Sequence, residues 1–287
     1  MPPRQPPRWR RYEKNVRAIA LIASGTLALQ SSMLLAVDIG NSLVKFGVFD
    51  RESLVSRFEA ATDAIVGGDA LPAATIETIL EHKPDAVIVS SVVPEINAVF
   101  AAFGRSALDV ETIFVDRSFD FGLRIEYETP LTLGIDRLVA ASAAAAKYGM
   151  PCIVCDFGTA TTIDAVSAAG EYLGGTITPG IYTLARSLFQ NTSKLPEIKI
   201  QKPSSVIGKS TAGSIESGVF YGYIGLVEGI LSRMKVAIES DARVIATGGY
   251  VRLIADNTRI VDVVDENLML EGLCHLYALH KDSRPEE

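Results

Sequence analysis

The sequence predicts an α/β protein with two similar lobes. Two hairpins, at 34–50 and 151–166, lead to this prediction, because each reads as a buried strand, an Asp-x-Gly turn and a second strand. Equivalent positions in the two hairpins lie about 118 residues apart. Strands alternate with helices after each hairpin, which is typical of α/β folds. A doubly wound Rossmann sheet is not expected, because the chain contains neither G-x-G-x-x-G nor G-x-x-x-x-G-K-[ST].

The turn of the first hairpin carries an acid, a glycine, an amide, a hydroxyl and a lysine. Gly40 and Asn41 indicate a turn, because both residues tolerate a positive φ. Backbone N–H groups at the tip, with Ser42 and Lys45, could hold a polyphosphate, and Asp38 could face its metal ion. From this stretch alone, an ordinary hairpin with an Asx-type turn explains the residues equally well.

The first lobe is expected to span 33–149. Its expected strands lie at 34–38, 44–50, 54–59, 85–90 and 112–115, and its expected helices at 72–82, 95–103 and 136–148. Pro72 suits a first helical turn, where the N–H group that proline lacks would have no helical partner. Gly149 is a typical residue to follow the last of these helices.

The second lobe is expected to span 150–280, with a charged, disordered tail after 281. Beyond its hairpin we expect a helix at 180–190, a long helix at 212–238, a strand at 242–249, a strand at 259–263 and a helix at 267–280. Four glycines lie on one face of the long helix, at Gly218, Gly222, Gly225 and Gly229. This stripe predicts a close helix–helix contact, either within the lobe or across a dimer.

Two glycine-rich stretches of the second lobe are candidates for ligand contact. The segment 174–180 reads as a loop leading into a helix, and such loops and helix N-termini favour anions. A tight connection between elements explains it equally well. The pair Gly248-Gly249 ends a strand, where it would let a flat ligand lie against the backbone.

The composition is that of an ordinary globular protein of 287 residues, 48% hydrophobic and 21% charged. The net charge of −7 is unevenly spread, because residues 1–32 hold six basic residues against Glu13 alone. That stretch carries +5, which leaves −12 for the remainder. An acidic body argues against a nucleic-acid partner, although a local cradle for an anionic substrate remains compatible with it.

Residues 1–32 differ from the rest of the chain. A Pro- and Arg-rich start precedes the apolar run 18–29, an order that resembles a signal peptide. The run is too short to span a membrane, which takes about 20 apolar residues. A translation start set upstream of Met33, or a disordered tail, explains the pattern better than secretion. We therefore expect a cytoplasmic protein with no membrane partner.

Cys152 and Cys155 form a C-x-x-C pair, which is found in redox and zinc sites. These cysteines lie on an expected strand, where side chains three positions apart point to opposite faces. No second Cys or His pair lies at zinc spacing. We therefore interpret them, with Cys274, as buried small residues in a reducing compartment.

Four segments, 38–45, 134–137, 156–162 and 174–180, together resemble the bacterial type III pantothenate kinases. The similarity runs in order from Met33 to about residue 275, and four collinear motifs are far more specific than one. The resemblance implies the fold of the acetate kinase, sugar kinase, heat-shock ATPase and actin superfamily. In that fold, two duplicated ribonuclease H-like lobes enclose a nucleotide cleft.

The resemblance also implies how ATP is bound. The phosphates would contact the tip of the first hairpin and one threonine of the second, namely Asp38, Ile39, Gly40, Asn41, Ser42, Leu43, Val44, Lys45 and Thr159. Magnesium bound with ATP would lie near Asp38, and Asp156 would hold a monovalent cation, either potassium or ammonium. The pair Gly248-Gly249 would lie on the adenosine side.

For the acceptor, the resemblance implies that Asp136 takes the proton of the pantothenate hydroxyl. The pantothenate site would be lined by Tyr127, Gly134, Ile135, Asp136, Arg137 and Thr211. From position alone, Asp136 could instead cap the helix that begins beside it. Arg137 suits the carboxylate of pantothenate, although a solvated helix charge is the alternative.

The expected activity is therefore ATP-dependent phosphorylation of pantothenate to 4′-phosphopantothenate, the first step of coenzyme A synthesis. The enzyme is expected to be a homodimer. Two alternatives remain at this stage. The first is a nucleotide-binding accessory protein on the same fold, which would not need Asp38, Asp136 and Asp156 together. The second is a kinase of the same superfamily that acts on a sugar or acetate, against which the segment 134–137 argues.

Overall fold

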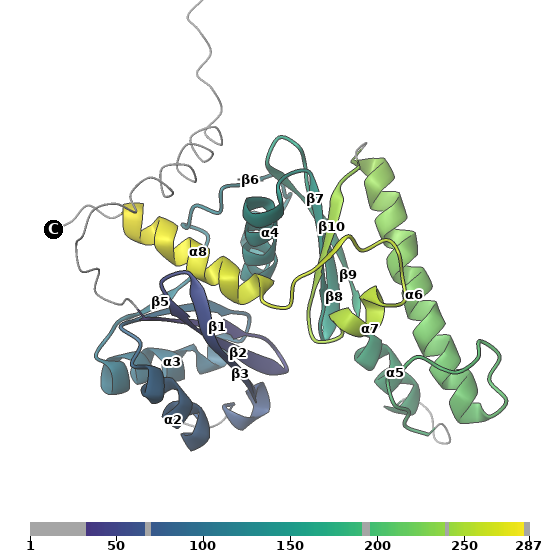
Figure 1. Cartoon of the computed structure of the whole chain (residues 1–287), viewed down its shortest axis with the longest axis horizontal. Helices are drawn as coiled ribbons and strands as arrows, with labels where there is room; N and C mark the ends of the chain where they lie inside the picture. The colour runs from purple at the N-terminus through teal and green to yellow at the C-terminus, as the bar shows by residue number, and fades with distance from the viewer. Residues whose placement is uncertain (1–32, 67–69, 191–195, 239–240, 284–287) are drawn as a thin grey trace, which may run out of the picture.

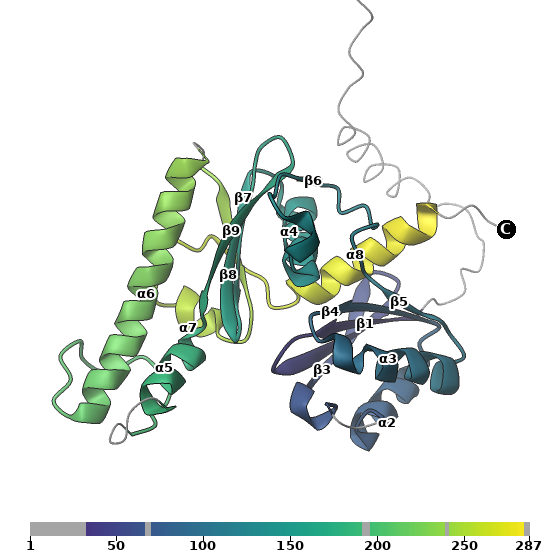
Figure 2. The same cartoon turned by 180° about the vertical axis from the view of Figure 1, so that it is seen from behind.

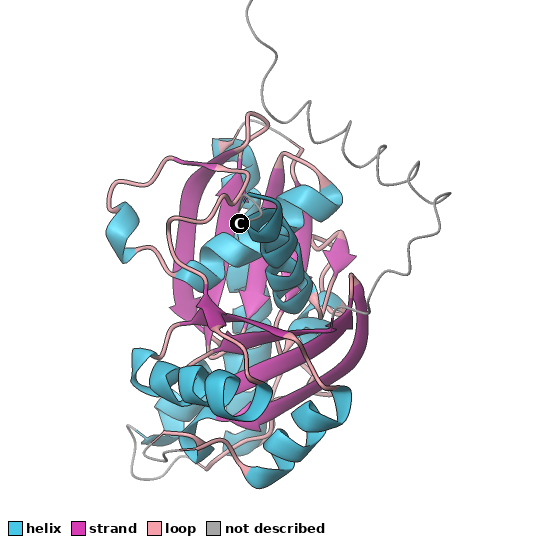
Figure 3. Ribbon diagram, turned by 90° about the vertical axis from the view of Figure 1, so that its left-hand side faces the viewer, coloured by secondary structure: helices cyan, strands magenta, loops and turns pink. Residues whose placement is uncertain are grey.

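The computed structural model describes residues 33–66, 70–190, 196–238 and 241–283. These residues form two lobes, each built around one mixed β-sheet, and Figure 3 shows the strands of the two sheets as separate groups. The predictions for residues 1–32 and for the last four residues lie outside the described residues. Within the described ranges, no helix is both long enough and apolar enough to cross a membrane.

The first sheet has the strand order β3-β2-β1-β4-β5. Its strands are β1 (Met33–Ile39), β2 (Leu43–Asp50), β3 (Ser53–Ala61), β4 (Ala86–Ser91) and β5 (Thr112–Phe114). The first three strands are antiparallel neighbours, whereas β4 runs parallel to β1 and β5 runs parallel to β4. All five strands begin and end within two residues of the predicted ranges.

Strand β1 is buried on both faces, which explains why its sequence is apolar without alternation. Leu35 and Val37 pack with residues of α2 (Ala73–His82) and α3 (Asn97–Phe103) on one face. Leu34 and Ala36 pack on the other face with α4 (Ile135–Tyr148) and α8 (Leu268–Ser283). Single helical turns complete this half of the chain, at η1 (Thr62–Ala64), η2 (Pro94–Ile96), η3 (Gly104–Leu108) and η4 (Pro130–Thr132).

The second sheet has the strand order β11-β10-β7-β8-β9-β6. Its strands are β6 (Arg124–Ile125), β7 (Cys152–Phe157), β8 (Ala160–Val166), β9 (Glu171–Pro179), β10 (Arg243–Thr247) and β11 (Val263–Val264). Strands β7, β8 and β9 are antiparallel, and β10 runs parallel to β7. This order repeats that of the first sheet strand by strand, with β6 added at one edge, so the predicted duplication is confirmed.

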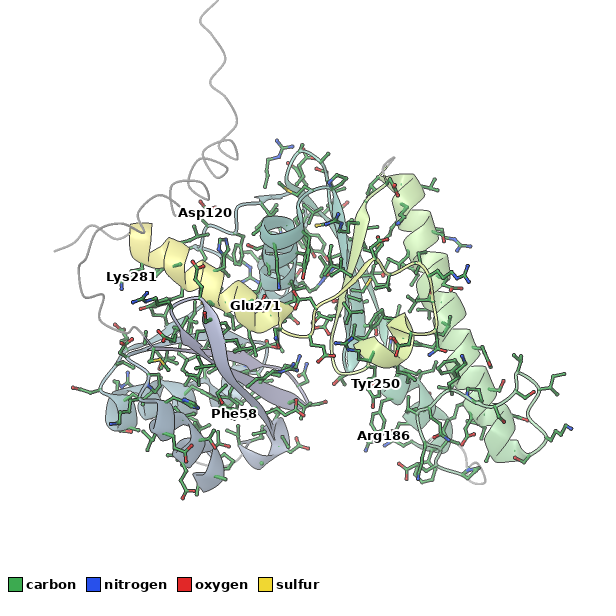
Figure 4. All side chains as sticks on the ribbon, viewed as in Figure 1. Phe58, Asp120, Arg186, Tyr250, Glu271 and Lys281 are labelled. Atoms are coloured by element: carbon green, nitrogen blue, oxygen red, sulfur yellow. The ribbon has the colours of Figure 1, made fainter. Side chains whose placement is uncertain are left out.

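The closing helix of each half reaches the sheet of the other half. Helix α4 contacts β7 and β8 as well as β4, whereas α8 contacts β1, β2 and β4. The two helices also pack against each other, and Figure 1 shows α8 passing beside α4 above the first sheet. Figure 4 labels Glu271 of α8, which lies near this junction. Its carboxylate forms an ion pair with Lys147 of α4. The boundary at 149 and 150 stays a prediction, because the core is shared across it.

The other face of the second sheet is covered by α5 (Ile181–Gln190), α6 (Thr211–Ala237) and α7 (Val251–Ala255). Figure 2 shows α6 on the outer side of this sheet, away from α4. Gly218, Gly222 and Gly225 lie on the exposed face of α6, and each has open space beside its Cα. The predicted contact of this glycine stripe within the lobe is therefore wrong, and a contact across a dimer remains a prediction.

Three further predictions change in detail. The segment 174–180 is not a loop, because β9 continues through it to Pro179 before α5 begins at Ile181. The strand expected at 259–263 is reduced to Val263–Val264. Helix α8 continues to Ser283, so the chain is still helical where a disordered tail was expected.

The C-x-x-C pair lies on β7, as predicted, with its two cysteines on opposite faces. Cys152 packs into the core shared with α4 and α8, whereas Cys155 packs into the core beneath α6. Both thiols are free and buried, and burial raises the pKa of the Cys152 thiol to about 12. A thiol held protonated in this way is a packing group and not a nucleophile.

Candidate functional site between the two hairpins

Asp38, which is buried, and Lys45, which is half-buried, form an ion pair near the tip of the first hairpin. They face each other across β1 and β2, and the Lys45 Nζ lies 3.7 Å from the Asp38 Oδ2. Burial raises the pKa of Asp38 to about 6; Lys45 opposes this shift, while Asp156 and Asp136 add to it. Burial also opposes the charge of Lys45, but Asp38 and Asp156 raise its pKa above the usual value. The site thus holds one lysine among three carboxylates.

Hydrogen bonds fix the backbone at the tip of the first hairpin, and the residues of the tip are exposed. The Gly40 N–H donates to the Leu43 carbonyl at 3.0 Å, and the Thr62 hydroxyl donates to the Gly40 carbonyl at 2.7 Å. Asn41, Ser42 and Leu43 are exposed. A rigid, exposed turn next to a lysine is the type of structure that can hold phosphate oxygens.

Asp156 occupies the equivalent place on the second hairpin. Its cross-strand neighbour is Thr162, where the first hairpin has Lys45. The Asp156 Oδ1 is buried and has no hydrogen-bond partner among the described residues. Burial raises the pKa of this carboxyl, and Lys45 lowers it. An oxygen that is buried without a donor fits a bound cation, because leaving such a group unpaired is costly.

The two hairpin tips touch each other. The hydroxyls of Ser42 and Thr159 lie 2.7 Å apart, although 117 positions separate them in the chain. The backbone of Thr159 is fixed in turn, since its carbonyl accepts from the Gly180 N–H at 3.0 Å and from the Thr183 hydroxyl at 2.6 Å. A side chain at Gly180 would collide with the carbonyls of Gly158 and Thr159. The glycine that ends the segment 174–180 therefore permits close packing against the second turn.

Asp136 lies in the first turn of α4, where its charge interacts with Asp38 of the first hairpin and Asp156 of the second. Its Oδ1 accepts the Arg137 N–H at 2.8 Å, and a side chain at Gly134 would occupy the space of this same oxygen. Helix α4 has Gly134 as its N-cap, so the alternative of a capping aspartate does not describe Asp136. Burial raises the pKa of Asp136; the Arg137 N–H opposes the shift, and Asp156 adds to it.

Arg137 has a carboxylate partner inside the protein. Its guanidinium donates to Asp164 of β8, from Nε at 3.1 and 3.2 Å and from Nη2 at 2.5 Å. The Tyr172 hydroxyl donates to the same carboxylate at 2.7 Å. Arg137 is only 6% exposed, and although burial opposes its charge, Asp164 raises its pKa. The structure thus pairs Arg137 with Asp164, whereas the sequence suggested an open side chain for a substrate carboxylate.

Two glycines of the segment 174–180 leave space for the side chains that surround Arg137. Gly174 has φ +100, and a side chain there would press on the Tyr127 ring at 3.2 Å. A side chain at Gly175 would collide with the carboxylate of Asp164. Tyr127 lies beneath Arg137, whose Cζ is 5.8 Å from the ring centroid. The prediction of a loop is wrong here, because these two glycines lie in β9 and make room for Tyr127 and Asp164. Anion binding at this segment stays a prediction.

Thr211 is the one predicted site residue that lies apart from the others. It begins α6, where the Ser210 side chain accepts the Gly213 N–H at 3.1 Å. Helix α6 packs on the face of the second sheet opposite to α4 and Asp136. Within the described chain, Thr211 and Asp136 are therefore on opposite sides of one sheet.

The pair Gly248-Gly249 lies beside the second hairpin. Gly248 has φ +99, and a side chain there would collide with Asp156 and with the backbone of Phe157. The following residue, Tyr250, donates its N–H to the Phe157 carbonyl at 3.2 Å. Only glycine allows this approach, which puts the loop after β10 next to Asp156.

Sequence reasoning missed three polar residues that support the site. Asp164 and Tyr172 hold Arg137, and Arg117 donates to the segment that precedes Asp136. A signal was present for Asp164, because it is a charged residue within the apolar strand Ile163–Val166. Such a residue is rarely buried without a partner. Arg117 carried no comparable signal.

The described residues fit the implied metal ions to different degrees. They contain no group of three or more His, Cys, Asp and Glu side chains placed to hold a metal. Asp38 supplies a hard carboxylate oxygen, which suits magnesium when phosphates and water provide the other ligands. Asp156 supplies the unpaired oxygen described above. Each residue therefore offers a carboxylate oxygen to a cation whose other ligands come from outside these side chains.

Residues 34–233 match the family model described as type III pantothenate kinase. The chain belongs to this family. Its members transfer phosphate from ATP to pantothenate, which is the first step of coenzyme A synthesis. The match includes both hairpins, Asp136 and most of α6.

Curated relatives agree with this assignment over almost their whole length. A type III pantothenate kinase from Dehalococcoides mccartyi is 39% identical over 254 residues, covering 86% of this chain and 96% of the relative. Another from Geotalea daltonii is 40% identical over 256 residues, covering 88% of this chain and 100% of the relative. Both carry the name of the kinase, which favours an enzyme over a non-catalytic accessory protein.

Solved structures support the fold. A protein from Campylobacter jejuni, described as a Baf family transcriptional activator, has a TM-score of 0.56 at 21% identity and covers 86% of this chain and 99% of its own. Component A of (R)-2-hydroxyglutaryl-CoA dehydratase from Acidaminococcus fermentans has a TM-score of 0.51 at 15% identity, with coverage of 88% and 100%. At such identities the likeness extends to the fold alone, which is the duplicated ribonuclease H-like fold of actin-like ATPases.

Proposed function

We propose that this kinase binds ATP between the two hairpin tips and uses Asp136 as the base that activates pantothenate. One observation carries the proposal. Asp38, Asp136 and Asp156 come from three distant parts of the chain. They nevertheless lie close enough that the charges of Asp136 and Asp156 both raise the pKa of Asp38. Carboxylates that are brought together and partly buried are typical of a site that handles phosphates and protons.

The reaction needs a base for the acceptor hydroxyl. As the hydroxyl oxygen of pantothenate bonds to the terminal phosphorus of ATP, the bond from that phosphorus to the bridging oxygen breaks and ADP leaves. The hydroxyl proton then passes to an Asp136 carboxylate oxygen. Because burial raises the pKa of Asp136, this carboxylate is a stronger base than an exposed aspartate.

The hairpin tips have separate tasks in this proposal. The segment from Asp38 to Lys45, with Thr159, contacts the ATP phosphates, and the loop at Gly248 faces the adenosine. Asp38 would hold magnesium, and Asp156 would hold potassium or ammonium. When bound, these cations would neutralise phosphate charge during transfer. Lys45 adds a fixed positive charge next to both carboxylates.

Pantothenate would lie against Tyr127, Gly134, Ile135 and Arg137, with its hydroxyl near Asp136. Since Arg137 is paired with Asp164, we assign it chiefly to the shape of this site. Thr211 faces away from Asp136, so a role in the same site requires that a second copy of the chain supplies it. The exposed glycines of α6 offer a surface for that copy. We therefore propose a homodimer, which light scattering would test, in the cytoplasm.

The test of the catalytic proposal is an Asp136→Asn substitution. A coupled assay of ADP release, with and without pantothenate, should show that this variant loses about 10³-fold in turnover while its melting temperature stays near that of the wild type. Potassium and sodium buffers are compared in the same assay. The matched control is Asp120→Asn, because Asp120 is exposed and also accepts a nearby backbone N–H. Full turnover in the Asp136 variant would remove this assignment.

A further inference from the structure

Arg117 holds the main chain of the segment that leads to Asp136. It lies three residues after β5 ends, and its exposed side chain reaches η4. The Nε donates to the Pro130 carbonyl at 2.9 Å. The Nη2 donates to the Leu131 carbonyl at 2.7 Å and to the Leu133 carbonyl at 2.8 Å. One guanidinium therefore binds three carbonyl groups within four residues.

The segment that Arg117 holds is short and directly joined to the base. The Thr132 N–H donates to the Thr129 carbonyl at 3.0 Å, which closes η4 into a compact turn. Leu133 follows and is buried at 1% exposure. Only Gly134 and Ile135 then separate this anchor from Asp136. A shift of the turn would therefore be passed on to the Asp136 carboxylate.

The opposite side of Asp136 is held by the second sheet. Arg137, its neighbour in the chain, is paired with Asp164 of β8. The first turn of α4 is thus fixed from both lobes, by Arg117 on one side and by Arg137 on the other. The two anchors differ in burial, because Arg137 is buried and Arg117 is exposed.

We propose that Arg117 is a positioning residue for the phosphoryl transfer, which sets the place of Asp136 by holding residues 130–133. This inference rests on the proposed role of Asp136 as the base. A guanidinium suits the task, because its planar fork donates from two nitrogens at fixed angles. A lysine ammonium is a point donor on a flexible stem and does not reproduce this geometry.

The exposure of Arg117 makes the inference testable. Water can replace its bonds to the carbonyls of η4, so the fold should survive the loss of the side chain. The restraint on the segment would not be replaced. A displacement of about 1 Å at a reacting group lowers turnover by about 10²-fold. We therefore expect a loss of turnover without a comparable loss of stability.

The experiment compares Arg117→Ala and Arg117→Lys with Arg243→Ala. Arg243 is the matched control, because it is also exposed and donates to the carbonyl of Tyr148 at the other end of α4. We expect Arg117→Ala to lower kcat by about 10- to 100-fold and to leave the Kd for ATP within about twofold. Arg117→Lys should recover only part of the loss, and Arg243→Ala should match the wild type.

A double-mutant cycle separates this inference from the proposed function. If Arg117 acts through Asp136, then Arg117→Ala should lower turnover no further in an Asp136→Asn background. Equal losses in both backgrounds would overturn the inference, as would a kcat for Arg117→Ala within about twofold of the wild type. A parallel drop in ATP affinity and melting temperature would also overturn it, by showing a general structural role. The Asp136 assignment itself is tested separately, by the turnover of the single variant Asp136→Asn, and full turnover there would contradict it.

Discussion

The two hairpins share one backbone plan and differ in the residue that faces the acid. Asp38 is opposite Lys45 on the first hairpin, whereas Asp156 is opposite Thr162 on the second. Both aspartates follow a buried strand, and burial raises the pKa of both carboxyls. The duplicated fold thus supplies two acids at equivalent places, but only one of them has a cation across the strand pair.

This difference predicts different partners for the two carboxylates. Asp38 has Lys45 at 3.7 Å, so its charge is balanced within its own hairpin. The buried Oδ1 of Asp156 has no hydrogen-bond partner among the described residues, and the charge of Lys45 reaches it from the other lobe. We infer that the first hairpin is specialised for phosphate and the magnesium bound with it, and the second for a monovalent cation.

Among changes to the two hairpins, the largest expected effect comes from removing the lysine. Lys45→Met should lower kcat by about 10²- to 10³-fold, because the ATP phosphates would then meet two carboxylates without a fixed positive charge. Thr162→Val is the equivalent change on the second hairpin and should stay within about threefold of the wild type. Steady-state assays at saturating magnesium measure both. Similar losses in the two variants would contradict the proposed division of tasks.

The duplicated plan could be predicted because its signals are local. Each hairpin places an Asp-x-Gly turn between apolar strands, and the structure confirms both hairpins and the repeated strand order. The segment 174–180 was misread because glycine has two uses. Gly174 and Gly175 looked like loop residues, but in β9 they make room for Tyr127 and Asp164. A glycine inside a strand often marks a close approach, but the sequence does not show which residue approaches.

The support of Asp136 could not be predicted for a similar reason. Asp136 was found from its motif, but its position depends on Arg117 and Asp164, which lie 19 and 28 positions away in the chain. Which arginine meets which carbonyl or carboxylate is decided by the packing of η4, α4 and β8, and not by spacing along the sequence. Tertiary pairs of this kind are the part of a site that a single sequence shows least.

A smaller effect is expected when the second hairpin is made to resemble the first. Thr162→Lys would place an ammonium opposite Asp156, where we propose that potassium binds. We expect this variant to keep about a tenth or more of wild-type turnover and to respond to potassium much less than the wild type, because the charge is then tethered. Turnover is compared in potassium and in sodium buffer at equal ionic strength.

The control for this change is Thr161→Lys one position away. Thr161 is fully buried, and its hydroxyl forms a hydrogen bond with the hydroxyl of Tyr223. Its side chain lies on the face of the sheet turned away from Asp156. A lysine there should destabilise the fold and should not replace potassium. An unchanged potassium response in Thr162→Lys would indicate that the cation is bound elsewhere, and the contrast between the hairpins would then lose its explanation.

The smallest expected effect concerns the stability of the enzyme without nucleotide. Asp38 has a pKa of about 6 in the fold, against a value of 3.8 for the free side chain. The folded state therefore holds this proton more tightly than the unfolded state. The contribution of Asp38 to the free energy of unfolding is fully present below about pH 4 and is lost as the pH rises through about 6. Each unit of the shift is equivalent to about 1 kcal/mol.

Urea unfolding from about pH 5 to about pH 7.5 measures this contribution against the rest of the protein. Asp38→Asn should flatten the pH dependence, because an amide has no proton to lose. Asp156→Asn should flatten it as well, since burial also raises the pKa of Asp156. We expect the Asp38 variant to gain less stability near neutral pH, because it also leaves Lys45 without its partner at 3.7 Å. A larger gain for Asp38→Asn than for Asp156→Asn would show that Lys45 does not balance Asp38 as the geometry indicates.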